Sequence, residues 1–330
     1  MHRPVLVITG ASAGIGRATA RIFGRRGWHV GLIARGVDGL EAAKREIEAT
    51  GGEALVLPAD VANHDEVEAA AERVQREWGA IDVWVNDAMA TIFCEFTAIS
   101  PADYKRATEV TYLGAVWGTR AALARMLPRN RGTIVQVGSA LAYRSIPLQA
   151  PYCAAKAAIR GFTDSLPSEL IHKKSRVHLT MVQLSAFNTP QFDWGRTCMT
   201  KQPQPLPPIF QPEVAAEAIY FAATHRRREV WVGWPAIKAI VGTRLLPGLG
   251  DRLLASEGYR GQHTDEPLPP GRRDNLYAPV AGDHGAHGRF DARAKERSGQ
   301  VWLTTHRGAA LAALALSLGA TALVRRRARS

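Results

Sequence analysis

Cysteine is scarce in this chain of 330 residues, which contains only Cys94, Cys153 and Cys198. Three cysteines cannot all pair with one another. Residues 1–4 lead straight into a strand-like run, so nothing at the N-terminus resembles a signal peptide. We therefore expect a reducing, cytoplasmic compartment and no disulfide framework.

Internal repeats are also missing. The apolar share of 46% and the charged share of 22% are ordinary for a globular protein. These values exclude a chain disordered throughout, a fibrous repeat and a multi-span membrane protein. Because the length exceeds the usual single-domain size of about 100–200 residues, we expect one large domain plus an extension, or two domains.

Acidic residues are in short supply: 30 Asp and Glu accompany 42 Lys and Arg, which gives a net charge of +12. Such a balance suggests nucleic acid or an anionic membrane surface as a partner. Before residue 225, however, there are 24 basic and 21 acidic side chains, against 18 and 9 in the remainder. The basic excess therefore belongs to the last third of the chain.

Short apolar runs alternate with segments of helical spacing through the first two thirds of the chain. Such alternation predicts an α/β fold, a doubly wound parallel sheet with helices on both faces. The expected strands are 5–9, 30–34, 54–57, 82–85, 133–137, 177–184 and 229–232. One expected helix runs from the first glycine-rich turn to about residue 26. The others cover 39–50, 65–78, 104–127 and 152–171.

The chain changes character after Pro235. We predict a domain over 1–235, a Gly/Pro/Arg-rich extension over 236–304 that wraps the domain or stays loose, and an apolar helix with an Arg-rich tail over 305–330. Residues 308–324 carry no charge, and as a helix they would span about 26 Å, slightly less than a bilayer core of about 30 Å. Three alternatives stay open: a membrane span, a helix packed on protein, and a helix on the membrane surface.

Glycines occupy the turn between the first expected strand and helix with the spacing GxxxGxG, at Gly10, Gly14 and Gly16. Glycine lets the backbone turn tightly and approach phosphate oxygens, and the helix N-terminus offers free N–H groups. With Ser12 and Ile15, these residues are predicted to bind a dinucleotide. A generic glycine turn is the alternative.

The end of the second strand selects the dinucleotide. Arg35 stands where an acidic residue would favour NAD, so we expect NADP, with Arg17 as a second contact to the 2′-phosphate. Asp60, followed by Val61, is placed to accept a hydrogen bond from the adenine amino group. The alternatives are two solvated arginines and a helix-capping aspartate.

Tyr152 and Lys156 form a YxxxK pair on an expected helix, where residues four apart share one face. A neighbouring cation lowers the pKa of a phenol, which makes Tyr152 usable as a general acid/base. The pair alone is common by chance. Ser139, at the end of a strand 13 residues upstream, adds a hydroxyl able to orient a substrate oxygen.

In this order, the glycine motif, Asp60-Val61, Ser139 and YxxxK resemble the short-chain dehydrogenase/reductase family over about residues 4–235. The resemblance implies a Rossmann-type fold and hydride transfer between NADP(H) and a carbonyl/alcohol pair. It assigns catalysis to Ser139, Tyr152 and Lys156. Tyr152 and Lys156 would also contact the cofactor, Lys156 at the nicotinamide ribose.

The sequence departs from the family's Asn-Asn-Ala-Gly after the fourth strand, which here reads Asn86-Asp87-Ala88-Met89. Asn86 and Ala88 are kept as implied cofactor contacts. Asp87 and Met89 alter the loop beside the cofactor.

Two further departures concern catalysis and the cofactor. Thr111 stands where the family has its fourth catalytic residue, an asparagine that helps hold a water in a proton relay to the lysine. The usual Pro-Gly after the sixth strand reads Ser185-Ala186, whereas Thr189 occupies the position that contacts the carboxamide.

Residues 187–212 would form a substrate lid by the same resemblance. Its aromatic and methionine side chains suggest an apolar carbonyl or alcohol as substrate, although packing onto the domain explains them equally well. The segment Asp283–His287 lacks the regular spacing of a metal site, so we expect no metal.

Two other functions are also weighed against the sequence. The departures at Asp87, Met89 and Thr111 also suit an NADP-binding protein with little turnover, a sensor or scaffold. Nucleic-acid binding through the Arg-rich end is not expected, because that end lacks interleaved aromatics. Homo-oligomer formation stays open.

Overall fold

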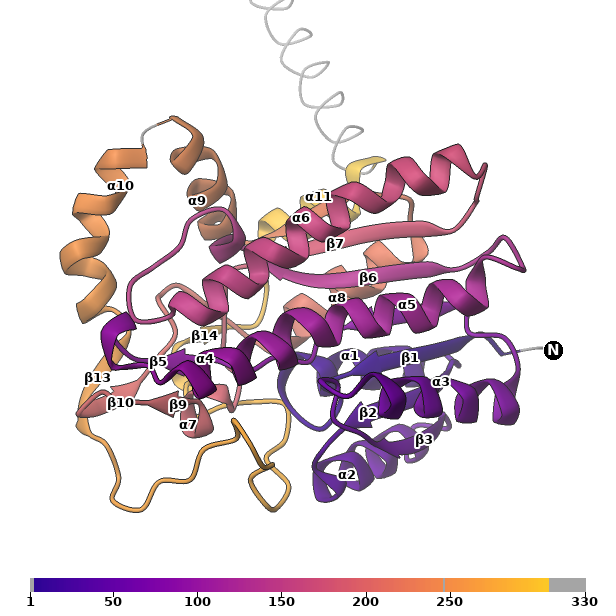
Figure 1. Cartoon of the computed structure of the whole chain (residues 1–330), viewed down its shortest axis with the longest axis horizontal. Helices are drawn as coiled ribbons and strands as arrows, with labels where there is room; N and C mark the ends of the chain where they lie inside the picture. The colour runs from indigo at the N-terminus through magenta and orange to yellow at the C-terminus, as the bar shows by residue number, and fades with distance from the viewer. Residues whose placement is uncertain (1–2, 246, 309–330) are drawn as a thin grey trace, which may run out of the picture.

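A central sheet organises the chain, whose computed structural model describes residues 3–245 and 247–308 (Figure 1). Seven parallel strands lie in the order β12-β7-β6-β4-β1-β2-β3. The order reverses direction beside β1, which creates the crevice where α/β sheets bind ligands. The strands are β1 (Val5–Thr9), β2 (His29–Ala34), β3 (Glu53–Pro58), β4 (Val83–Asn86), β6 (Thr133–Ser139), β7 (His178–Leu184) and β12 (Glu229–Val232).

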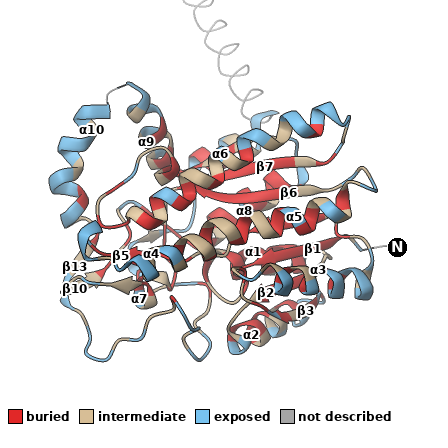
Figure 2. Cartoon of the chain, in the orientation of Figure 1, coloured by how far each residue is buried: buried red, intermediate tan, exposed pale blue. Residues whose placement is uncertain are grey.

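Helices cover both faces of this sheet. On one face, α1 (Gly14–Arg25), α2 (Val37–Glu48) and α8 (Pro212–Thr224) enclose one apolar core; on the other, α3 (His64–Trp78), α5 (Gly114–Met126) and α6 (Ala150–His172) enclose a second. The strands between them are almost entirely buried (Figure 2). The predicted Rossmann-type, doubly wound α/β fold is therefore confirmed.

One expected helix is broken. The sequence predicts a continuous helix over 104–127, whereas the structure has α4 (Pro101–Thr108), a π-helical turn (Glu109–Leu113) and then α5. Ser100 caps α4 by accepting a hydrogen bond from the Asp103 amide. A π turn inserts one residue into the helical repeat and is common at functional sites, and this one contains Thr111.

Small elements gather beyond the carboxyl ends of the central strands. Three small sheets form there, with strand orders β14-β11-β8, β10-β13 and β5-β9. Their strands and the short helix among them are β5 (Ile92–Phe93), β8 (Ala186–Phe187), α7 (Gln191–Trp194), β9 (Arg196–Thr197), β10 (Lys201–Pro203), β11 (Ile209–Phe210), β13 (His263–Pro267) and β14 (Ala294–Lys295).

The extension wraps the domain rather than staying loose. Two helices, α9 (Trp234–Leu245) and α10 (Pro247–Leu253), form an exposed arm, and α11 (Gly299–Thr305) lies against β12 and α8 (Figures 1 and 2). Between them runs irregular chain whose Leu276, Ala286 and Phe290 are buried. These apolar anchors are widely spaced, which explains why no periodicity marks them in the sequence.

The apolar segment 308–324 lies outside the described residues except for Gly308. Within residues 3–245 and 247–308, no helix has the length and apolar character to cross a bilayer.

The expectation of no disulfide is wrong. Cys94, after β5, is bonded to Cys198, after β9, and their Cα atoms lie 5.0 Å apart. Cys153 is free and buried. The odd number of cysteines does not exclude a disulfide. Two of the three pair across the β5-β9 ladder, and their bond fastens the lid to the domain.

Reduction of this bond should destabilise the protein. The bond joins residues 104 positions apart, so breaking it restores conformational entropy to the unfolded chain. We expect the free energy of unfolding to fall by about 2–4 kcal/mol in dithiothreitol or in Cys198→Ser, measured by urea denaturation. Cys153→Ala should keep the response to reductant. Identical unfolding curves with and without reductant would contradict the bond.

Candidate active site

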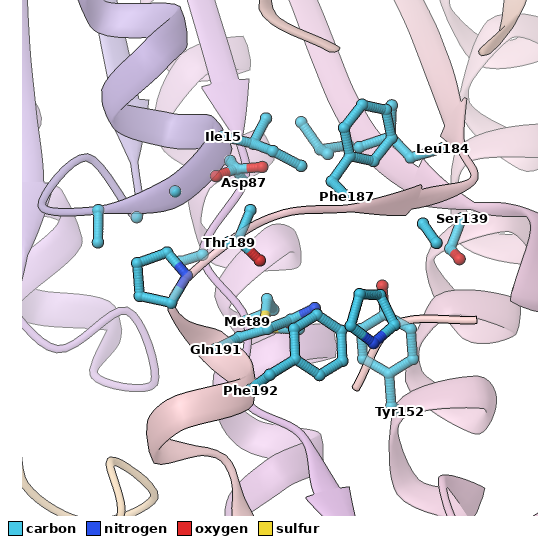
Figure 3. A pocket seen from close by; sticks show the side chains of 18 of the residues that line it. Ile15, Asp87, Met89, Ser139, Tyr152, Leu184, Phe187, Thr189, Gln191 and Phe192 are labelled. Atoms are coloured by element: carbon cyan, nitrogen blue, oxygen red, sulfur yellow. The ribbon is translucent and has the colours of Figure 1, made fainter. Parts of the chain in front are cut away.

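A cavity of about 520 Å³ opens at the carboxyl ends of the central strands. Most of the predicted site residues line it, although they come from distant parts of the sequence. Those that do are Gly10, Ser12, Gly14, Ile15, Arg35, Asp60, Val61, Ala88, Ser139, Tyr152, Lys156 and Thr189. Figure 3 shows Ile15 and Asp87 side by side, with Ser139 and Tyr152 in another part of the cavity wall.

The glycine turn is shaped for close approach of a phosphate. Gly10 has φ +75°, and a Cβ there would lie 2.9 Å from the Cα of Ala88. A Cβ at Gly16 would lie 2.2 Å from the carbonyl oxygen of Gly10. At the start of α1, the Ile15 amide makes no hydrogen bond within the described residues and lines the cavity. A helix N-terminus with such a free donor fits a pyrophosphate.

Arg35 lies in the wall of the cavity, but its guanidinium already has partners. It donates hydrogen bonds to the carbonyl oxygens of Asn275 and Leu276 in the extension. Burial lowers the pKa of Arg35, although nearby Asp60 opposes this. The cation is therefore fixed in place at the cavity wall by backbone oxygens.

The expectation for Arg17 is wrong. Its side chain is only 2% exposed and does not line the cavity. Glu46 and Asp283 both pair with its guanidinium. The sequence offered no sign of Asp283 as a partner, because it lies 266 residues away.

Asp60 faces the cavity with both carboxylate oxygens engaged. One accepts a hydrogen bond from the Ala62 amide at 3.0 Å, and the other pairs with Arg106. The turn-forming role that was the alternative for Asp60 is thus present, together with its position beside Val61 in the cavity wall.

Ser139, Tyr152 and Lys156 meet between β6 and α6. Ser139 ends β6, and its hydroxyl accepts a hydrogen bond from the Leu141 amide and contacts the Tyr152 hydroxyl. Lys156 lies one helical turn beyond Tyr152, with its Nζ 5.6 Å from the centre of the tyrosine ring. The side chain of Lys156 is buried and donates to the carbonyl oxygen of Val137 at 2.6 Å.

The phenol behaves differently from the expectation that Lys156 lowers its pKa. Burial raises the pKa of Tyr152; a hydrogen bond with Ser139 opposes this, and the negative charge of Asp87 adds to it. The structure therefore holds Tyr152 in its protonated form at neutral pH.

Asp87 is the unusual charge in the site. Its carboxylate accepts a hydrogen bond from the Gly16 amide, and burial raises its pKa to about 7 against the attraction of Lys156. Burial lowers the pKa of Lys156 to about 8, and the charge of Asp87 opposes that shift. An acid and a base that both titrate near neutrality thus stand within one cavity.

Besides Arg17, three predicted site residues do not belong to the cavity lining. Gly16 lies behind the turn, where its missing side chain makes room for Gly10. Asn86 is buried and donates to Thr119 and Gln136. The Thr111 hydroxyl exchanges hydrogen bonds with the backbone of Ala90, at 2.9 and 3.1 Å. The Asn86 side chain therefore fastens β4 to α5 and β6, and the Thr111 side chain braces the loop after β4.

The side chains of the expected lid, residues 187–212, both line the cavity and pack onto the domain. Phe187, Phe192 and Trp194 line the cavity, together with Gln191 and several prolines. Phe192 also packs against Phe93 and Phe290 in a small core of its own. Packing and cavity lining are therefore two faces of the same side chains.

Sequence reasoning missed the contribution of the extension. Eight of its residues line the cavity: Ala236, Ala239, Leu254, Asn275, Pro279, Val280, Gly282 and His284. They form no motif, and the only signal near them was the Asp283–His287 segment. In the structure His287 pairs with Glu213 and Asp291, and no group of three or more metal-ligating side chains occurs among the described residues.

Comparison with known proteins agrees with this geometry. The family model for short chain dehydrogenases matches residues 4–194. An uncharacterized oxidoreductase of Bacillus subtilis (strain 168), YxnA, is 34% identical over 282 residues, covering 85% of this chain and 79% of that protein.

Solved structures of short-chain dehydrogenases and oxidoreductases are also similar to this chain. A short-chain dehydrogenase from Streptomyces avermitilis has a TM-score of 0.64 at 25% identity, covering 78% of this chain and 98% of its own. A metagenomic short-chain oxidoreductase, solved in complex with NADP, has a TM-score of 0.59 at 29% identity, covering 69% of this chain and 96% of its own. The chain therefore belongs to the short-chain dehydrogenase/reductase family and is an NAD(P)-dependent oxidoreductase that acts on small-molecule substrates.

Proposed function

We propose that the protein transfers a hydride between NADP(H) and an apolar carbonyl/alcohol pair. The observation that carries this proposal is the meeting of Ser139, Tyr152 and Lys156 with the glycine turn around one cavity. A bound nicotinamide cofactor would supply or accept the hydride, and every proton step falls to the chain's own residues.

Each catalytic residue has a separate task in this proposal. Ser139 donates a hydrogen bond that orients the substrate oxygen, and Tyr152 gives that oxygen a proton during reduction. Burial keeps Tyr152 protonated, which is the form this step requires, and the same group accepts the proton in the reverse direction. Lys156 binds the nicotinamide ribose and supplies positive charge to the proton path.

The cofactor is held by the residues of the turn and the strand ends. Ile15 offers its amide to the pyrophosphate, and Gly10, Ser12 and Gly14 shape the surface around it. Arg35 meets the 2′-phosphate, Asp60 and Val61 border the adenine, and Ala88 and Thr189 border the nicotinamide half. The NADP found with the metagenomic relative supports the choice of NADP over NAD.

Two departures from the family pattern act indirectly in this proposal. Thr111 is a positioning residue that fixes Ala90 and so the loop carrying Met89. Asp87 sets the charge felt by Lys156 and Tyr152. The lid aromatics and Leu206 favour an apolar substrate and form part of the remaining wall, together with the polar side chains of Gln149, Gln191 and Gln204.

Replacement of Tyr152 by Phe tests catalysis against the rival reading, a cofactor-binding protein without turnover. Because the phenol is the proton donor, we expect kcat for NADPH-dependent reduction of a panel of apolar carbonyls to fall by about 10²–10⁴-fold. Binding of NADPH, measured by fluorescence, should change little. Tyr220→Phe, on the surface of α8, is the matched control. Equal rates in the wild type and Tyr152→Phe would refute the assignment.

Replacement of Arg35 by Ala tests the choice of cofactor. A charge-assisted contact with the 2′-phosphate is lost, so the Kd for NADPH should rise about tenfold, equivalent to ~1.4 kcal/mol. The Kd for NADH, which lacks this phosphate, serves as the internal control and should change by less than about twofold. An equal loss for both cofactors would show that Arg35 does not select NADP.

Asp87→Asn tests the charge coupling in the site. The charge of Asp87 raises the pKa of both Tyr152 and Lys156, so its removal lowers both. The rise of alcohol oxidation with pH, which follows Tyr152 deprotonation, should move to lower pH. Asp164→Asn, paired with Arg228 outside the cavity, is the control. An unchanged pH profile in Asp87→Asn would contradict the coupling.

A further inference from the structure

Residues 274–291 of the extension, called the strap from here on, cross the cavity beside the glycine turn. Asn275, Pro279, Val280, Gly282 and His284 line the same cavity as Arg35 and Ile15. The strap begins and ends outside it. It therefore spans the part of the site that the proposed function gives to the adenosine end of the cofactor.

Both ends of the strap are fastened to the domain. At its start, Asp274 pairs with Arg196 at 3.1 Å, and the Tyr277 hydroxyl donates to Asp103 at 3.0 Å. At its end, the Phe290 amide donates to the Asn188 side chain at 3.0 Å. Fixed ends limit the motion of the chain between them.

The middle of the strap contacts the phosphate-binding turn itself. The Gly14 amide, first in α1, donates to the carbonyl oxygen of Gly285 at 3.1 Å. The Gly285 amide in turn donates to the Asp283 carboxylate at 3.1 Å, and Asp283 pairs with Arg17. The hydrogen bond from Arg17 holds the pKa of Asp283 below its usual range, so the carboxylate stays charged.

The strap engages only part of the phosphate-binding turn. The Gly14 amide donates to the strap, whereas the amides of Ser12, Ala13 and Ile15 make no hydrogen bond within the described residues. The strap also fixes the cations nearby, because Arg35 and Arg106 both donate to the carbonyl oxygen of Leu276. Segments far apart in the sequence thus define a single anion site between them.

We propose that the strap is a cofactor-binding element, which encloses the adenosine end of NADP(H), and that Asp283 is the residue that holds it closed. This proposal rests on the proposed function, since it concerns the same cofactor. A cofactor beneath the strap leaves only when the Gly14–Gly285 and Arg17–Asp283 contacts open. Capture requires the same opening, so weakening these contacts speeds both entry and release of the cofactor.

Release of NADPH from Asp283→Ala measures this directly. The variant removes both the partner of Arg17 and the acceptor of the Gly285 amide, while Glu46 still pairs with Arg17. We expect koff for NADPH, from stopped-flow fluorescence, to rise at least fivefold. Asp265→Ala is the matched control, because this exposed carboxylate pairs with Lys201 and lies outside the cavity.

Hydrogen exchange gives a second readout on the unmodified protein. Saturating NADPH should slow exchange of the amides at 282–288 in the wild type and do so less in Asp283→Ala. Wild-type koff in Asp283→Ala, or strap exchange that does not respond to NADPH, would overturn the proposal while leaving cofactor binding intact. Failure of the wild type to bind NADPH at all would instead refute the proposed function, and the strap's role with it.

Discussion

The site depends on a close approach between two backbone segments, the turn after β1 and the loop after β4. Any side chain at Gly16 would collide with the carbonyl oxygen of Gly10, and any at Gly10 with the backbone of Ala88. Thr9 fastens the two segments, because its hydroxyl accepts hydrogen bonds from the amides of Asp87 and Ala88, each at 3.1 Å. This contact places the start of α1, with the Ile15 amide, directly beside the loop that carries Asp87. The glycine turn and the loop that carries Asp87 are consequently held together as one unit.

The same contact accounts for the charges in the site. Asp87 can keep a carboxylate there because the Gly16 amide donates to it and Lys156 lies within its field. A neutral amide in this position would accept the hydrogen bond from Gly16 but would leave Lys156 without a counter-charge. In a medium of low dielectric constant such a charge acts strongly on its neighbours. The departure from the family's Asn-Asn-Ala-Gly thus changes the electrostatics of the site while keeping its backbone geometry.

The sequence predicts best what depends on neighbouring residues. The seven central strands were predicted within a few residues, because buried parallel strands are short apolar runs between helices. Ser139, Tyr152 and Lys156 were found because their spacing reflects one strand and one helix face. The pairings of Cys94 with Cys198 and of Arg17 with Asp283 were not found, because each joins residues more than a hundred positions apart. Such pairings depend on tertiary packing, which local sequence patterns do not predict.

The extension carries most of the excess of basic residues, yet it contributes to the site of a domain whose own charges nearly balance. Its excess charge suggested a surface for polyanions, yet at the cavity it contributes the carboxylate of Asp283 and the carbonyl oxygens that receive Arg35 and Arg106. The domain therefore supplies the cations, and the extension supplies the acceptors that orient them. Because a ligand stabilises whatever structure binds it, a cofactor held between the two parts also stabilises their association. Folding of the extension onto the domain and affinity for the dinucleotide then become linked properties of one site.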